Sequence, residues 1–304
     1  MAHYIFENGK MKNIAESSFK LEKEIQEIIE KNLKLLFDLE YIRSEFELHG
    51  LRIDTLAFDK QSNSFAIIEY KQDKRFSVID QGFAYLSLML NNKADFVLEF
   101  NERTKTQLNK NRIDWSQSRI IFISQSFTTY QKLAINFRDL PIELWEIKKY
   151  GDGSASLNQL ISPASSESIK TVSREDTMVE KVSRELKKYT EEDHASGIPE
   201  NILELYNKYK DMVLNISDGI TIRPRKWYIG FVAKTNFTDV LLQKSKIKIW
   251  LNLKKGAIDD PKKLARDISN VGHWGNGDYE ISISDDKNLE YIISLIKQAY
   301  LKNK

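Results

Sequence analysis

The sequence predicts an α/β protein, with a mixed sheet flanked by helices followed by a smaller α+β domain that has an antiparallel sheet. Three observations lead to this prediction. Residues 1–160 alternate helix-like and strand-like apolar patterns, a charged and Ser-rich stretch follows at 161–199, and residues 200–304 carry apolar patterns of their own. We therefore expect two domains, 1–160 and 200–304, joined by a partly helical linker over 161–199.

The first domain opens with a predicted helix at 17–37. Its apolar stripe at helical spacing consists of Ile25, Ile29, Leu33 and Leu36, and Ser17 or Ser18 is a suitable N-cap. Strand-like runs follow at 41–48, 51–58 and 64–71. Beyond them we expect helices at 77–90, 93–108 and 127–137 and strands at 119–124, 140–149 and 154–160.

The linker and the last third carry further patterns. A helix is expected near 177–189, inside the linker. In the C-terminal domain the patterns predict helices at 200–214, 261–269 and 287–301 and strands at 227–233, 238–242, 246–253 and 279–284. Pro261 suits the first turn of the middle helix.

Composition excludes several kinds of site. The chain has no cysteine, which excludes disulfides, thiolate metal sites and Cys nucleophiles, and it has four scattered histidines. Any metal is therefore expected on carboxylates, which favours Mg²⁺ or Mn²⁺. The net charge of +2 does not by itself predict a nucleic-acid partner. Without a long apolar segment or an apolar signal core, we expect a cytoplasmic protein that does not bind membranes.

Asp54, Glu69 and Lys71 form the pattern that indicates chemistry. Asp54 lies in one predicted strand, and Glu69 and Lys71 close the next one. Side chains alternate along a strand, so Glu69 and Lys71 share a face. Two carboxylates on adjacent strands can hold a divalent metal for phosphodiester hydrolysis, and Lys71 can polarise the attacking water. The spacing alone favours the alternative, an ordinary strand-end Asp and an exposed Glu–Lys pair.

Other residues favour one combined site. Glu22 falls on the apolar stripe of the first helix, although a Glu at a helix start is also favoured by the helix dipole. Gln81 and Tyr85 share a helix face after the Glu-x-Lys strand, where they can orient the site or form part of the core. Glu45 lies on the strand face away from Phe46, a pattern that also fits a solvated face.

Basic residues supply candidate contacts with nucleic acid. Lys74 and Arg75 follow the site directly and can contact phosphates, although a solvated turn explains them equally well. In the C-terminal domain one face of a predicted strand carries Lys244, Lys246, Lys248 and Trp250. Such a face can follow a nucleic-acid backbone and stack a base. We favour the alternative of an exposed edge strand protected by lysines.

These residues together resemble a known superfamily. Asp54 in Arg-Ile-Asp-Thr-Leu, Glu69 and Lys71 in Ile-Ile-Glu-Tyr-Lys, and Gln81 and Tyr85 in Gln-Gly-Phe-Ala-Tyr resemble the RecB-like branch of the PD-(D/E)xK, or restriction-endonuclease-like, nucleases. The helical Glu22 with the following Asn32-Leu-Lys-Leu-Leu is similar to small prokaryotic proteins related to archaeal branched-DNA and mismatch endonucleases. The resemblance covers about residues 15–150, and residues 200–304 resemble a domain of uncharacterised function often found behind such nuclease-like domains.

The resemblance implies a sheet flanked by helices, Mg²⁺ or Mn²⁺ as cofactor, and DNA as substrate. It implies that Asp54 and Glu69 ligate metal, that Lys71 assists the nucleophile, and that Gln81 and Tyr85 are auxiliary. The residue patterns described above add Glu22 as a candidate metal ligand and Glu45 as a candidate site residue. The leading hypothesis is a metal-dependent endonuclease in restriction, repair or phage defence, and a homodimer is compatible with it. The alternatives are a non-catalytic nucleic-acid- or protein-binding module on a nuclease-like fold, and an accessory protein without a nucleic-acid role.

Overall fold

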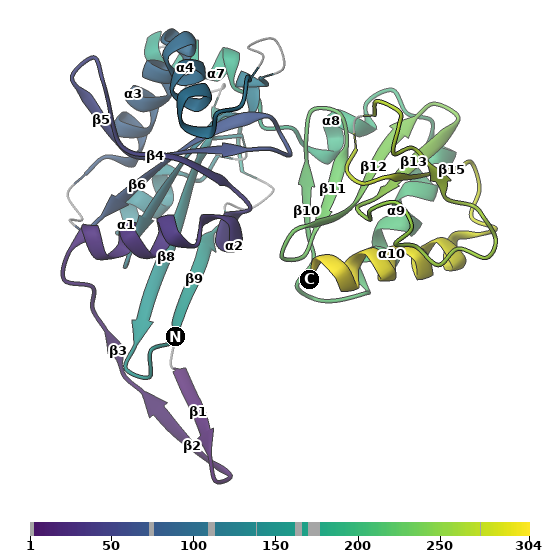
Figure 1. Cartoon of the computed structure of the whole chain (residues 1–304), viewed down its shortest axis with the longest axis horizontal. Helices are drawn as coiled ribbons and strands as arrows, with labels where there is room; N and C mark the ends of the chain where they lie inside the picture. The colour runs from purple at the N-terminus through teal and green to yellow at the C-terminus, as the bar shows by residue number, and fades with distance from the viewer. Residues whose placement is uncertain are drawn as a thin grey trace. The chain divides into compact units, whose positions relative to one another are not determined.

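The computed structural model describes residues 3–72, 76–108, 113–137, 139–161, 166–169, 177–273 and 275–304. The chain forms two compact units, Met1–Lys188 (unit 1) and Tyr189–Lys304 (unit 2). Unit 1 has a mixed sheet with helices on both faces and unit 2 an antiparallel sheet with helices (Figure 1). The predicted fold class is thereby confirmed. Within the described residues, no helix is both long enough and apolar enough to span a membrane.

Unit 1 begins with strands and ends with a helix. In chain order its elements are β1 (His3–Glu7), β2 (Lys10–Ile14), β3 (Glu16–Ser17), α1 (Glu22–Lys31), α2 (Leu33–Phe37), β4 (Glu40–Leu48), β5 (Leu51–Asp59), β6 (Ser64–Lys71), α3 (Val78–Asn91), α4 (Lys93–Thr104), a short 3₁₀ helix η2 (Trp115–Gln117), β7 (Arg119–Ser124), α5 (Thr129–Ala134), β8 (Ile142–Tyr150), β9 (Ala155–Leu160) and α7 (Thr177–Glu185). The main sheet has the order β3-β8-β7-β6-β5-β4, and β9 also pairs with β8. Strands β6, β7 and β8 are parallel and the other pairs antiparallel.

The central strand β6 is buried on both faces. Phe65 and Ile67 pack into the core beneath α3, α4 and α7, whereas Ala66 and Ile68 pack into the core beneath α1 and α2. A strand covered on both sides reads as a continuous apolar run instead of an alternating one. Because this run is packed on both sides, the position of Glu69 and Lys71 at the end of the strand is fixed within unit 1.

Helix α7 belongs to unit 1. Its Val182, together with Leu186 just beyond its end, lies in the core that α3 and α4 cover. Sequence patterns had placed this segment in the linker. Helices α7 and α3 pack against each other, so the packed part of unit 1 extends to about Lys188.

The predicted helix at 17–37 is wrong at its start and in its middle. Ser17 lies in β3, and Leu21 is extended just before α1 begins at Glu22. The helix is interrupted at Asn32, whose side-chain amide donates to the carbonyl of Ile28, and α2 follows. A side chain that bonds its own backbone in this way competes with helix propagation.

Unit 2 contains a six-stranded antiparallel sheet. Its elements are α8 (Glu191–Ala195), α9 (Glu200–Leu214), β10 (Thr221–Pro224), β11 (Ile229–Val232), β12 (Asn236–Gln243), β13 (Lys246–Leu251), β14 (Arg266–Asp267), β15 (Tyr279–Ile283) and α10 (Leu289–Asn303). The strand order is β10-β11-β12-β13-β15-β14. Helices α9 and α10 share one core with the inner face of the sheet.

The predicted helix at 261–269 is wrong. Lys263 has a left-handed backbone with φ of 54°. The carboxylate of Asp260 accepts the N–H of Ala265 at 2.7 Å. An Asp that bonds backbone N–H groups favours a turn over a helix. The segment forms turns and then the short strand β14.

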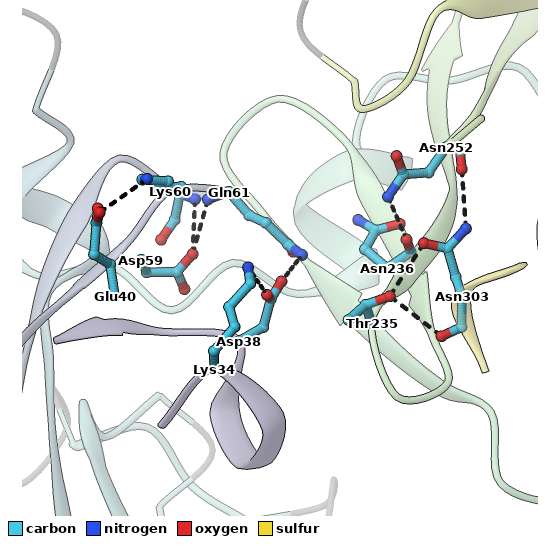
Figure 2. A network of polar contacts seen from close by, with 11 residues as sticks. Lys34, Asp38, Glu40, Asp59, Lys60, Gln61, Thr235, Asn236, Asn252 and Asn303 are labelled. Carbon is cyan, nitrogen blue, oxygen red and sulfur yellow. Dashed lines mark hydrogen bonds and ion pairs between the residues drawn. The ribbon is translucent and has the colours of Figure 1, made fainter. Parts of the chain in front are cut away.

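Polar side chains fasten chain segments within each unit, as Figure 2 shows. In unit 1 the turn between β5 and β6 is held because Asp59 Oδ1 accepts the N–H of Gln61 at 3.0 Å, and Gln61 Nε2 donates to Asp38 Oδ2 at 2.6 Å. In unit 2 Asn303 Nδ2 donates to the carbonyl of Asn252 at 2.9 Å, which ties the end of α10 to the sheet. The first network fixes the register of the two strands that carry the candidate site.

Candidate functional site

The candidate site forms where β5 and β6 stop pairing with each other. Their ladder ends at Thr55 and Ile68, so Asp54 and Glu69 come next on the two strands. Beyond that point, side-chain carboxylates accept the backbone N–H groups in place of the ladder's carbonyls. The N–H of Asp54 donates to Glu69 Oε1 at 3.1 Å, and the N–H of Tyr70 donates to Asp54 Oδ2 at 3.0 Å. The two carboxylates are thus held beside each other by backbone donors.

Lys71 completes the cluster on β6. Its Nζ lies 3.2 Å from Glu69 Oε2, and its side chain is 18% exposed, compared with 1% for Glu69. Alternation along β6 puts Glu69 and Lys71 on the face that carries Phe65 and Ile67, which is the face covered by α3. The structure therefore brings together Asp54, Glu69 and Lys71.

Glu22, in the first turn of α1, contacts the chain just after Lys71. Its Oε1 accepts the N–H of Gln72 at 2.6 Å. Gln72 in turn donates through Nε2 to the carbonyls of Phe19 and Lys20, at 3.2 and 3.0 Å. These bonds join the start of α1 to the end of β6. Sequence reasoning missed Gln72, although it directly follows the Glu-x-Lys motif.

Glu45 faces Asp54 across the β4–β5 pair. Ser44 pairs with Thr55 and Phe46 with Ile53, so Glu45 is opposite Asp54. It has a left-handed backbone with φ of 52°, and its carboxylate forms an ion pair with Arg52 at 2.9 Å. Glu45 is near enough for its charge to raise the pKa of Asp54.

With both Asp54 and Glu69 ionised, the pair would carry one negative charge more than Lys71 balances. The pKa of Glu69 is raised to about 8, first by burial and then by the charge of Asp54, whereas Lys71 and the Asp54 N–H act in the opposite direction. Burial also raises the pKa of Asp54, against the effect of the Tyr70 N–H and Lys71, and the charges of Glu45 and Glu22 add to the increase. Buried carboxylates of this kind are stabilised when a cation lies between them.

Tyr85 and Gln81 border the site from α3. The Tyr85 hydroxyl donates to the carbonyl of Arg52 at 2.8 Å, and the side chain of Gln81 hydrogen-bonds to the same hydroxyl. Burial raises the pKa of Tyr85, and the charge of Glu69 raises it further. Both residues therefore lie close to the carboxylates, and Tyr85 holds the backbone of β5 just before Asp54.

Tyr85→Phe is expected to lower the free energy of unfolding by about 1 kcal/mol, because the part-buried hydrogen bond from the Tyr85 hydroxyl to the carbonyl of Arg52 is lost. Urea denaturation measures this difference. Tyr41→Phe is the matched control, since the Tyr41 side chain is exposed and its hydroxyl bonds Ser44 near the surface. Equal stability of the two variants would contradict the role assigned to the Tyr85 hydroxyl.

A second polar network holds β5 from the opposite face. Gln26 Nε2 donates to the carbonyl of Asp54 at 3.1 Å and to Glu30 Oε1 at 3.0 Å. Glu30 also accepts the hydroxyl of Thr55 at 2.5 Å, and that hydroxyl is 3.0 Å from the hydroxyl of Tyr70. Helix α1 is thereby fastened to both site strands. Sequence reasoning did not identify these residues.

The other predicted contacts lie elsewhere. Lys74 and Arg75 fall outside the described residues. Lys246, Lys248 and Trp250 alternate along β13 of unit 2, and Lys244 precedes that strand. Strand β13 lies between β12 and β15, so the interpretation as an edge strand is wrong. Lys248 is paired with Glu280 at 3.1 Å.

Trp250 does not reach the surface. Its side chain is 2% exposed and packs with Tyr228 and Ile268. Gly275 lies so close that a Cβ added there would come within 2.4 Å of the indole ring. The structure therefore does not present Trp250 as a surface on which a base can stack.

The donor set suits a hard cation, although the described part of the chain does not arrange three ligands around one point. Asp54, Glu69 and Glu22 offer carboxylate oxygens, the ligands that Mg²⁺ and Mn²⁺ prefer. Among the residues described, no group of three or more Asp, Glu or His side chains is arranged to hold a metal ion. The fit to a cation therefore depends on the Asp54–Glu69 pair, whose buried carboxylates resist ionisation until a positive charge lies beside them.

Comparison with known proteins gives one relative along almost the whole chain. An uncharacterized protein of Haemophilus influenzae is 47% identical over 299 residues, which cover 98% of this chain and 99% of the relative. Residues 191–303 match the model of a domain of unknown function, DUF5655. This match lies within unit 2.

Three solved structures are similar to part of the chain. A repair endonuclease from Pyrococcus abyssi aligns with a TM-score of 0.23 and 19% identity, covering 40% of this chain and 45% of that one. The apo form of EndoMS aligns with a TM-score of 0.25 and 17% identity over 38% and 42% of the two chains. A complex of EndoMS with double-stranded DNA has a TM-score of 0.23 and 16% identity over 40% and 44%. Each alignment spans less than half of the solved chain.

Proposed function

The chain belongs to one family with the uncharacterized protein of Haemophilus influenzae, and we propose that it is a metal-dependent nuclease that hydrolyses DNA phosphodiester bonds. One observation carries the proposal. Asp54 and Glu69 sit beside each other at the end of a paired ladder, with Lys71 Nζ 3.2 Å from Glu69. Two carboxylates that hold a divalent metal, with a lysine beside them, would supply what phosphodiester hydrolysis requires. The resemblance of these motifs to the PD-(D/E)xK nucleases supports the proposal.

In the proposed mechanism each residue has a distinct task. Asp54 and Glu69, with Glu22 as a third carboxylate, would hold Mg²⁺ or Mn²⁺, and the metal would supply charge neutralisation at the phosphate. Lys71 donates from Nζ to the attacking water and orients it. Tyr85 and Gln81 keep β5 and its Asp54 in position. Lys74 and Arg75 are proposed to contact the substrate's phosphates.

A panel of substrates tests the proposal with the full chain. After removal of metal with EDTA, the protein is incubated with linear, nicked, branched, mismatched and single-stranded DNA and with RNA, with either Mg²⁺ or Mn²⁺ added. We expect cleavage of at least one DNA that depends on added metal. If every substrate stays intact with both metals, the nuclease proposal fails.

The second candidate is a non-catalytic nucleic-acid-binding module. It is favoured by the observation that no three carboxylate or histidine side chains converge among the described residues. Titration with Mn²⁺, followed by electron paramagnetic resonance, separates the two candidates. If the protein is a nuclease, Mn²⁺ binds through Asp54 and Glu69. If the protein binds DNA without binding Mn²⁺ and cuts none of it, the second candidate is supported.

A further inference from the structure

The N-terminal hairpin of β1 and β2 has an apolar face that stays exposed among the residues of unit 1 that the structure describes. Tyr4, Phe6 and Met11 lie on this face, and their side chains are 49%, 72% and 64% exposed. The hairpin forms a two-stranded sheet of its own and extends beyond the ends of β8 and β9 (Figure 1). An isolated two-stranded hairpin is marginally stable in water, and a sheet with more strands is stabler.

The hairpin is anchored to unit 1 at its base. His3 stacks on Tyr150 with ring centroids 4.3 Å apart, and its Nε2 is 3.2 Å from the hydroxyl of Ser154. At the other end, Asn8 and Gly9 form the turn with φ of 50° and 76°. Two positive φ angles are typical of a type I′ turn, whose flanking residues bond each other across the hairpin. Here those flanking residues are Glu7 and Lys10.

The direction of the backbone groups follows from this turn. Amide and carbonyl groups alternate in direction along a strand, so those of Glu7, Ile5 and His3 point toward β2. The corresponding groups of Tyr4 and Phe6 point toward the open edge of β1. This edge offers two residues whose backbone donors and acceptors can pair with another strand.

We propose that this edge pairs with the same edge of a second copy of the chain, with the two β1 strands antiparallel and centred on Ile5. In that register Tyr4 of each copy lies opposite Phe6 of the other copy, and both residues turn their backbone groups toward each other. The pairing makes a four-stranded sheet with one continuous apolar face, formed by Tyr4, Phe6 and Met11 of both copies. Such a contact is isologous and closes as a dimer.

Polar complementarity favours this register over others. Centring on Ile5 places His3, which can donate a hydrogen bond, opposite the Glu7 carboxylate of the second copy. Centring on Phe6 would instead place Ile5 opposite Glu7. Pairing through the β2 edge, centred on Lys12, would place the two Lys12 ammonium groups directly opposite each other, which is destabilising. The edge of β2 is thus protected by lysines, whereas the edge of β1 is open.

Disulfide trapping tests the register, because the natural chain contains no cysteine. In the proposed pairing the two Ile5 residues form a pair without mutual hydrogen bonds, with Cα atoms roughly 4.5 Å apart. A disulfide spans this distance without strain. We expect the full-length Ile5→Cys variant to form a covalent dimer under mild oxidation. The matched Lys12→Cys variant, on the protected edge, should remain largely monomeric.

Sedimentation equilibrium tests the contact without a crosslink. The wild-type chain should form a dimer that dissociates on dilution. A double variant with Tyr4→Glu and Phe6→Glu places like charges opposite each other and should weaken the dimer at least about tenfold. A second variant, with Tyr4→Lys and Phe6→Lys, should restore dimers when mixed with the first. Tyr130→Glu serves as the control, because it puts the same charge on an exposed tyrosine of α5 outside the hairpin, and it should leave the dissociation constant of the dimer unchanged.

Three results would overturn the proposal. The first is a wild-type chain that stays monomeric at micromolar concentrations. The second is a dimer that the double-Glu variant does not weaken. The third is equally rapid crosslinking of the Ile5→Cys and Lys12→Cys variants. Loss of nuclease activity has no bearing on these outcomes, since the hairpin proposal does not depend on the proposed function.

Discussion

Asp54→Asn is expected to reduce the rate of metal-dependent DNA cleavage by about three orders of magnitude or more, which corresponds to roughly 4 kcal/mol of lost transition-state stabilisation. The Asn side chain still accepts the N–H of Tyr70 through its carbonyl oxygen, so the local backbone is retained. The change removes the negative charge beside Glu69. The measurement is the single-turnover cleavage rate on the best substrate of the panel, at saturating Mg²⁺.

The control for this experiment is Glu47→Gln. Glu47 is exposed on β4, so the variant makes the same change of charge away from the site. Its cleavage rate should stay within about twofold of wild type, because solvent screens the charge of an exposed side chain. Thermal unfolding shows whether both variants are folded. A cleavage rate of Asp54→Asn within about tenfold of wild type would contradict the assignment of Asp54 as a metal ligand.

The centre of the site could be predicted from sequence because it depends on local periodicity. Asp54, Glu69 and Lys71 lie on strands whose apolar runs are easily recognised, and the alternation of side chains puts Glu69 and Lys71 on one face. Their grouping in the structure agrees with this expectation. Their chemical roles remain predictions until cleavage and metal binding are measured.

The supporting bonds could not be predicted, because they join distant segments through backbone atoms. Gln72 binds the carbonyls of Phe19 and Lys20, more than fifty residues earlier. Gln26, on α1, donates a hydrogen bond to the carbonyl of Asp54 on β5. No periodic pattern marks such residues, since a Gln on a helix surface and a Gln in a turn have the same appearance in a sequence.

The errors in the fold have a similar origin. The charged segment after Pro261 has the composition of a helix. The carboxylate of Asp260 nevertheless accepts the N–H of Ala265, and Lys263 adopts a left-handed backbone. Trp250 alternates with lysines, as an exposed residue would, but the loop around Gly275 covers it. Which face of a strand a later loop covers is decided by tertiary packing, and a single strand does not reveal it. The hairpin of β1 and β2 was not predicted, although Asn8-Gly9 is a local hairpin signal.

The second large effect concerns stability, because Glu69 is a buried acid with a raised pKa. Its pKa is about 8 in the folded protein and 4.5 when unperturbed. Between these values the folded state keeps a proton that the unfolded chain has lost. The free energy of unfolding of the metal-free protein therefore decreases as the pH rises from about 4.5 to 8, and the full loss is reached above pH 8. The difference amounts to about 3–5 kcal/mol.

Glu69→Gln should remove this dependence. Gln has nearly the shape of the protonated acid and does not ionise, so the variant should be about as stable as wild type at pH 5 and several kcal/mol stabler at pH 9. Urea denaturation in EDTA at pH 5, 7 and 9 gives the free energies. Glu47→Gln again serves as the control and should follow wild type. A stability difference between Glu69→Gln and wild type that does not grow with pH would show that Glu69 is not the source of the loss.

Adding Mn²⁺ to the same measurement connects stability with function. A cation that binds the folded state through ionised Asp54 and Glu69 stabilises wild type as its concentration rises above the dissociation constant. The Glu69→Gln variant has lost one charged ligand and should gain much less. At pH 9 the advantage of Glu69→Gln should therefore shrink or reverse in excess Mn²⁺. If both proteins gain equally, the cation binds elsewhere and Glu69 is not one of its ligands.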